Sequence, residues 1–281
     1  MGTEFPRTTV GGVSLSRMIV GTNWFLGYSH TSAAKDKFIR EYQTRERLAD
    51  TITVFLQSGV DAIMGMPVQI LSDAIRDAQD RVGRKMTLIL TPSFNVRPGG
   101  AKENDPEPTF DRCKALGATF CFPHTSVTDV LIDKRAREIR DLPTYTKMIR
   151  ERDMLPGLST HEPESIIFSD ERDYDVTTYI QILNAAGFLM HTEVDWAMRI
   201  IHNAKRPVMT IKPMAAGRLL PAVGLLFSWN AIREQDMVTV GTTTPEEAKE
   251  VIDLSLDFLS RRMPDNELQY TRSKKTLVSN K

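Results

Sequence analysis

The feature that most constrains the fold of this chain is the regular alternation of short apolar runs with longer amphipathic segments. This alternation is typical of repeated strand–helix units that build a parallel sheet. The predicted strands are Met18–Thr22, Asp61–Met64, Met86–Leu90, Thr119–Phe122, Leu155–Leu158, Phe188–Met190, Val208–Ile211 and Met237–Val240. Eight such strands in 281 residues predict a single α/β domain, a (β/α)8 or TIM barrel.

The segments between these runs carry apolar residues at helical spacing. The first helix places Leu48, Ile52, Phe55 and Leu56 on one face. The other predicted helices are Val68–Arg81, Thr109–Leu116, Pro143–Arg152, Val176–Asn184, Glu193–Asn203 and Pro245–Leu259. The last has the clearest start, because Thr244 and Glu247 form a capping box around Pro245.

Connections of unusual length complete the prediction. The Gly-Gly pair within Val10–Val13 predicts an N-terminal hairpin. Extended loops are expected after the first, third and fourth strands, at His30–Tyr42, Asn95–Pro108 and Thr125–Asp141. The sequence contains no evident linker, so residues 1–262 are expected to form the barrel and the polar residues 263–281 a mobile tail.

Composition excludes several function classes. Lys plus Arg and Asp plus Glu both total 36, so no net charge attracts nucleic acid or an anionic membrane. The sequence has neither a secretory signal pattern nor an apolar run of about 18 residues that would span a membrane. Two cysteines do not make a disulfide framework. We therefore expect a cytoplasmic protein with no nucleic-acid or membrane partner.

Several segments resemble aldo-keto reductases. Val10–Phe25 resembles that family's opening hairpin and first strand, and Lys147–Glu164 resembles its fourth helix through its fifth strand. Residues 212–219 (KPMAAGRL) and 240–247 (VGTTTPEE) resemble its seventh-strand and eighth-strand motifs. The resemblance implies the same barrel, with the active site at the C-terminal ends of the strands.

The family's catalytic residues are mostly missing. Its carbonyl reduction depends on an Asp, a Tyr, a Lys and a His, with the Tyr as general acid. Alignment puts Met64, Gln69 and Pro92 at the first three positions and keeps only the His, as His124. Because methionine and proline cannot transfer protons, ordinary NADPH-dependent carbonyl reduction is disfavoured.

The residues implied for a nicotinamide cofactor are mixed. Ser159 and Thr160 match positions that hold the nicotinamide amide in the family, whereas Ile211 replaces the aromatic residue that stacks on the ring. The basic residue that usually binds the 2′-phosphate of NADPH is absent. The residues before the last helix form a predicted anion site, because exposed amides and the helix dipole favour negative charge. They are Gly241, Thr242 and Thr243.

Histidines cluster at predicted strand ends. His124 ends the fourth strand, His161 follows the fifth and His191 follows the sixth, while His30 lies in the first loop. Together with Glu193, the set His124, His161 and His191 would suit a divalent metal such as zinc, iron or manganese. The alternative is that these imidazoles bond loops or line a pocket without metal.

Three residues are predicted to be catalytic. His124 is expected to polarise a carbonyl or exchange a proton, with His161 assisting. Lys212 ends the seventh strand and is expected to neutralise a phosphate or carboxylate. A Schiff base at Lys212 is the alternative if burial lowers its pKa, but anion binding is favoured.

Three functions remain open. The first is a non-redox enzyme acting on a small polar or anionic substrate, sugar-like or a phosphorylated carbonyl compound. It would use histidine acid–base chemistry, or metal-assisted lyase, isomerase or hydrolase chemistry. The second is an atypical NAD(P)-dependent oxidoreductase, with a residue such as Tyr28 as the replacement acid. The third is a non-catalytic barrel that binds a ligand or partner.

Overall fold

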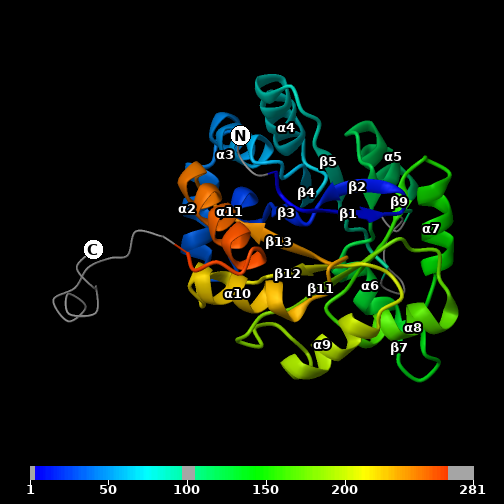
Figure 1. Ribbon diagram of the computed structural model, residues 1–281. Helices are drawn as coiled ribbons and strands as arrows, with labels where there is room; N and C mark the ends of the chain where they lie inside the picture. Colours follow the sequence, from blue (N-terminus) through cyan, green and yellow to red (C-terminus); the bar gives the residue numbers. More distant parts are fainter. Residues whose placement is uncertain (1–3, 97–104, 265–281) are drawn as a thin grey trace, which may run out of the picture.

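Parallel strands form the centre of the molecule and helices surround them (Figure 1). The structure, a computed structural model, describes residues 4–96 and 105–264. The neighbouring strands of the sheet pair in parallel. In sheet order they are β10 (Leu158–Ser159), β11 (Tyr179–Ile182), β12 (Val208–Ile211), β13 (Met237–Gly241), β3 (Met18–Gly21), β4 (Ala62–Gly65), β5 (Thr87–Leu90), β6 (Phe120–Cys121) and β9 (Leu155–Pro156).

The fifth barrel strand is divided into β9 and β10 by Gly157. β9 pairs with β6 and β10 pairs with β11, so the chain itself joins the two ends of the sheet. A Cβ atom at position 157 would overlap the ring of Phe122, which fills the barrel interior. Glycine is therefore required where this strand bends around the ring. The predicted eight-stranded barrel is confirmed.

The helices cover the outside of the barrel. They are α1 (Asn23–Leu26), α2 (Ala33–Tyr42), α3 (Arg45–Gln57), α4 (Gln69–Val82), α5 (Glu107–Ala115), α6 (Thr125–Leu131), α7 (Leu142–Arg150), α8 (Glu164–Arg172), α9 (Val194–Asn203), α10 (Pro221–Ala231) and α11 (Pro245–Leu259). The capping box of α11 is confirmed: Thr244 Oγ1 accepts from the Glu247 amide, and the Glu247 carboxylate accepts from the Thr243 amide. The sequence did not predict α2, α6, α8 or α10 as helices.

Two antiparallel hairpins flank the barrel. The predicted one consists of β1 (Arg7–Val10) and β2 (Val13–Ser16), and its apolar side chains join the interior cluster below the strands. The other consists of β7 (Ile132–Asp133) and β8 (Glu138–Ile139), inside the predicted fourth loop. The first predicted loop likewise contains α2, so both loops are folded rather than irregular.

The predicted sixth strand was wrong. The sequence predicts a helix over Val176–Asn184 and a strand over Phe188–Met190, but residues 179–182 form β11 and the preceding helix is α8. The segment is rich in β-branched and aromatic residues and is buried on both faces. Its alternating pattern is therefore lost, and a short apolar run of this kind does not distinguish helix from strand.

Parts of the prediction lie beyond what the structure describes. Of the predicted tail 263–281, residues 265–281 lie outside the described residues, as do residues 97–104 of the predicted third loop. Within residues 4–96 and 105–264, no helix combines the length and apolarity needed to cross a membrane.

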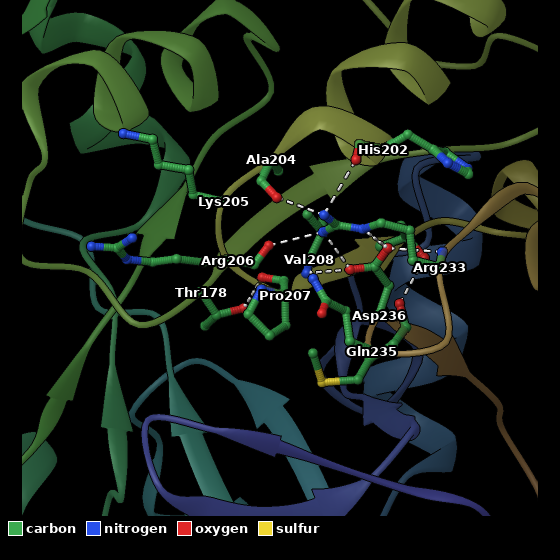
Figure 2. A network of polar contacts seen from close by, with 12 residues as sticks. Thr178, His202, Ala204, Lys205, Arg206, Pro207, Val208, Arg233, Gln235 and Asp236 are labelled. Carbon is green, nitrogen blue, oxygen red and sulfur yellow. Dashed lines mark hydrogen bonds and ion pairs between the residues drawn. The ribbon is translucent and has the colours of Figure 1, made fainter.

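A charged network closes the N-terminal end of the barrel between β12 and β13 (Figure 2). Asp236 is fully buried and accepts from the Val208 amide and from the Arg233 amide, Nε and Nη2, at 2.8–2.9 Å. Arg233 also donates to the carbonyl oxygens of Ala204 and Arg206. Both charges are thus paired and hydrogen-bonded, as buried ions require.

Candidate active site

The C-terminal ends of all eight barrel strands surround one cavity of about 380 Å³. Seven predicted site residues line it: His124, Ser159, His161, Lys212, Gly241, Thr242 and Thr243. Three others do not line it: Thr160, His191 and Glu193. The cavity therefore lies where active sites of such barrels are found, and it separates the predicted residues into two groups.

Lys212 directly follows β12 and projects toward the first loop. Its φ angle is +62°, and its Nζ lies 3.1 Å from Nε2 of His30. Burial lowers the pKa of Lys212 to about 8. Within the described part of the chain, Lys212 forms no ion pair. A lysine amine is therefore held in the cavity without a neutralising partner.

His30 receives two hydrogen bonds on the same ring nitrogen. Lys212 Nζ and Asn23 Nδ2, the latter at 3.3 Å, both approach Nε2. Because both partners are donors, Nε2 must be the accepting nitrogen, so the ring is neutral with its proton on Nδ1. Burial and then the charge of Lys212 lower the pKa of His30, which favours this neutral form. Sequence analysis assigned His30 no role beyond its place in the first loop.

His124 caps the N-terminus of α6 with its own ring. Nδ1 accepts from the backbone amide of Ser126 at 3.2 Å and lies 2.9 Å from that residue's Oγ. Burial, followed by the charge of Lys212, lowers the pKa of His124. The neutral ring therefore carries its proton on Nε2 and is a hydrogen-bond donor to a ligand.

His161 lies in the loop after β10, which Asp129 of α6 holds in place. The Asp129 carboxylate accepts from the His161 amide and from the hydroxyls of Thr125 and Thr160 at 2.5 and 2.7 Å. Burial, then Lys212 and the neighbouring histidines, lowers the pKa of His161 to about 4. The ring is thus unprotonated at neutral pH. The sequence missed Asp129, since the predicted irregular loop gave no sign that it faces β10.

The contacts of Thr160 correct the prediction that it holds a cofactor. Its hydroxyl donates to Asp129 and contacts the backbone of Glu162, away from the cavity. Of the two residues implied for a nicotinamide amide, only Ser159 faces the cavity. The orientation of Thr160 depends on a residue far away in sequence, so the motif alone did not reveal it.

The predicted metal set is not assembled. His191 Nδ1 lies 2.6 Å from Glu162 Oε1, and Glu162 also binds Lys134. Glu193 is exposed at the start of α9 and accepts from the Thr192 hydroxyl. Among the described residues, no group of three or more His, Cys, Asp or Glu side chains could hold a metal ion. The physical reason is that β11 ends at Ile182, so a long loop carries His191 away from the strand ends.

The predicted anion site at α11 is already occupied by a carboxylate. Glu247 Oε2 accepts from the Thr243 amide at 2.6 Å, and Glu250 lines the cavity one helical turn further on. These two residues of α11 form what we call the α11 wall. A phosphate placed here would meet both carboxylates, which outweighs the attraction of the helix dipole. The residues at this wall therefore do not fit the phosphates of a nicotinamide dinucleotide.

Two threonines of the cavity lack hydrogen-bond partners. Thr239 Oγ1 and Thr242 Oγ1 are buried, and neither has a partner within the described residues. Both residues line the cavity. Since buried hydroxyls are almost always bonded, these two groups are available for a polar ligand.

The positions of the missing reductase residues carry no replacement acid. Met64 lines the cavity, Gln69 is exposed and donates to Asp73, and the Pro92 carbonyl accepts from the His124 amide. Tyr28 is 52% exposed and does not line the cavity. The centre of the cavity is therefore basic, and the carboxylates among its described lining residues are those of Glu247 and Glu250 at α11. Such a field attracts a small anion.

Several solved structures similar to this chain are described as aldo-keto reductases. One, described as an aldo-keto reductase from Pseudomonas aeruginosa, has a TM-score of 0.62 and 14% identity over 90% of this chain and 95% of its own. The glycerol dehydrogenase from Gluconobacter oxydans and an aldo/keto reductase from Klebsiella pneumoniae, solved with NADP and acetate, both have TM-scores of 0.55 and 15% identity. Each match covers 94% of this chain and 98% of the other. No protein-family model and no curated protein matches the chain. The chain thus has an aldo-keto reductase-like barrel.

Proposed function

We propose that the cavity is the active site of an enzyme that performs acid–base catalysis on a small anionic carbonyl compound. The observation that carries this proposal is the convergence of Lys212, His30, His124 and His161 on one cavity. Among the described residues that line it, the carboxylates belong to α11. Groups with perturbed pKa values that gather in a cleft are characteristic of catalytic sites.

Three of these four groups have distinct parts in this reaction. The charge of Lys212 attracts the carboxylate or phosphate of the substrate. His124 Nε2–H donates to the carbonyl oxygen, where negative charge develops as a neighbouring C–H bond is broken. The neutral ring of His161 removes that proton. The outcome is proton exchange or isomerisation next to the carbonyl group.

A nicotinamide-dependent oxidoreductase is the second candidate, because the similar structures are named as reductases and a dehydrogenase. Ser159 and the unbonded Thr239 and Thr242 hydroxyls offer polar contacts to a cofactor in the cavity. The carboxylates at α11 and the lack of a tyrosine acid count against it. The likeness of the chain to solved reductase structures gives no support to lyase, isomerase or hydrolase chemistry, and the oxidoreductase fits that likeness at least as well.

The test is hydrogen–deuterium exchange of pyruvate and dihydroxyacetone phosphate, followed by proton NMR in D₂O. We expect the protein to accelerate exchange of the hydrogens next to the carbonyl. His161→Asn should reduce the rate by about 100-fold or more, as loss of a general base does. The matched control is His202→Asn, a histidine at the opposite end of the barrel whose ring contacts only the Ala231 carbonyl.

Cofactor titrations separate the two candidates. Saturable binding of NADH or NADPH, with carbonyl reduction and without exchange, would replace the proposal by the oxidoreductase. Absence of exchange and of reduction, with saturable phosphate binding, would leave a ligand-binding barrel.

A further inference from the structure

The amine of Lys212 is buried, and none of the residues that the structure describes places an anion beside it. Burial alone accounts for its lowered pKa, and its hydrogen-bond partner is the neutral His30. Apolar side chains such as Ile180, Ile211 and Met214 line the same cavity. A lysine in such surroundings is an activated nucleophile, because its neutral form is populated near neutral pH.

We infer that Lys212 is a covalent nucleophile that forms a Schiff base with the carbonyl carbon of a small anionic aldehyde or ketone. This inference rests on the proposed function and assigns its substrate class: a carbonyl compound that carries a carboxylate or phosphate.

The backbone at this position is strained. Lys212 has a φ angle of +62°, and Ala215 and Ala216 in the following turn have φ angles of +50° and +55°. Side chains other than glycine adopt this region at a cost, and such residues concentrate at functional sites. The turn ends the β12 ladder and brings Nζ to His30 instead of letting the side chain extend into solvent.

The neighbouring imidazoles provide the proton transfers. His30 Nε2, 3.1 Å from Nζ, accepts a proton from the ammonium group. The free amine then attacks the carbonyl carbon and a C–N bond forms, while the oxygen accepts a hydrogen bond from His124 Nε2–H and takes a proton from the attacking nitrogen. The carbinolamine then receives the proton held by His30 and loses that oxygen as water, which leaves a protonated iminium on Lys212 and a neutral His30. An ammonium and a carbonyl have become an iminium and one water, with no oxidant or reductant.

The iminium also explains how a weak base is sufficient. With a pKa of about 4, His161 is a weak base, so its removal of a proton is faster from a more acidic C–H bond. An iminium acidifies the adjacent C–H bond far more than a carbonyl does. It also keeps the positive charge of Lys212, so the attraction for an anionic substrate is retained.

Reductive trapping tests the inference. The protein is incubated with cyanoborohydride and pyruvate or dihydroxyacetone phosphate, or with acetylacetone alone, and modified lysines are identified by peptide mass spectrometry. We expect Lys212 to be modified at least tenfold faster than Lys249, which is exposed and paired with Asp253. The rate should rise with pH through about 8, the pKa of Lys212.

Lys212→Arg separates the inference from the proposed function, since arginine keeps the charge but is not a nucleophile. The covalent role predicts that this variant folds, shows no trapping at position 212 and loses exchange activity. Retained exchange in Lys212→Arg, or modification of Lys212 no faster than Lys249 in the unaltered protein, would overturn the covalent role and leave acid–base catalysis standing. Reductive trapping at Lys212 without exchange of the substrate hydrogens would contradict the proposed function instead.

Discussion

Buried charged groups have different surroundings at the two ends of the barrel. At the N-terminal end, Asp236 and Arg233 are paired with each other and with backbone groups (Figure 2). At the C-terminal end, Lys212 is buried against a neutral imidazole, and the Thr242 hydroxyl has no partner in the part of the chain that the structure describes. The first arrangement stabilises the fold, whereas the second leaves polar groups available for a ligand. In barrels of this kind, the N-terminal end contributes to stability and the C-terminal end carries the active site.

Asp236→Ala should produce the largest effect. It removes the acceptor of the Val208 amide and leaves the Arg233 guanidinium, only 18% exposed, without its carboxylate. Breaking a buried ion pair in this way should lower the free energy of unfolding by about 3–5 kcal/mol. Urea denaturation measures this change. Asp253→Ala is the control, because it breaks the exposed pair with Lys249 and should cost less than about 1 kcal/mol. Equal losses would mean that the network contributes no special stability.

Lys212→Met should raise the free energy of unfolding, whereas Asp236→Ala lowers it. The pKa of Lys212 is lowered from 10.5 to about 8, so protonation of the folded state is penalised by at most about 3 kcal/mol. Removing the amine should therefore stabilise the protein at pH 7 by up to that amount, while phosphate binding is lost.

The pH dependence has a defined sign. Below pH 8 both states of the wild type are protonated and the penalty is constant. Between pH 8 and 10.5 the unfolded state binds more protons than the folded state, so wild-type stability rises with pH. The difference between Lys212→Met and wild type should shrink over this interval. A stability difference between the two proteins that does not change with pH would show that burial does not destabilise the protonated form of Lys212.

Local patterns in the sequence were sufficient for much of this architecture. The capping box at Thr244 and the apolar runs of β12 and β13 depend on neighbouring residues, and they were predicted within a residue or two. The exception is β11. Both of its faces are covered by the surrounding structure, so its sequence carries no alternation from which a strand can be recognised.

The candidate site was predictable only as a location. Position after a strand indicated that His124, His161 and Lys212 would meet, and they line one cavity. Their protonation depends on contacts between distant segments, such as Ser126 with His124 and His30 with Lys212. The misplaced sixth strand put His191 into a metal set, whereas in the structure it binds Glu162.

Thr242→Val should give the smallest effect and the cleanest comparison. Valine keeps the shape of threonine but lacks the hydroxyl, and Thr242 Oγ1 is buried without a partner. We expect the variant to gain about 1 kcal/mol of unfolding free energy, because the cost of an unsatisfied group is removed. Thr210→Val is the matched control, since that buried hydroxyl donates to the Met237 carbonyl at 2.9 Å and should cost about 1 kcal/mol when removed. Opposite signs of the change in unfolding free energy for the two substitutions would show that the unbonded Thr242 hydroxyl lowers stability, as expected of a group that binds a ligand. A loss in both would mean that Thr242 is bonded in solution, and the contrast between the two ends would then rest on Lys212 alone.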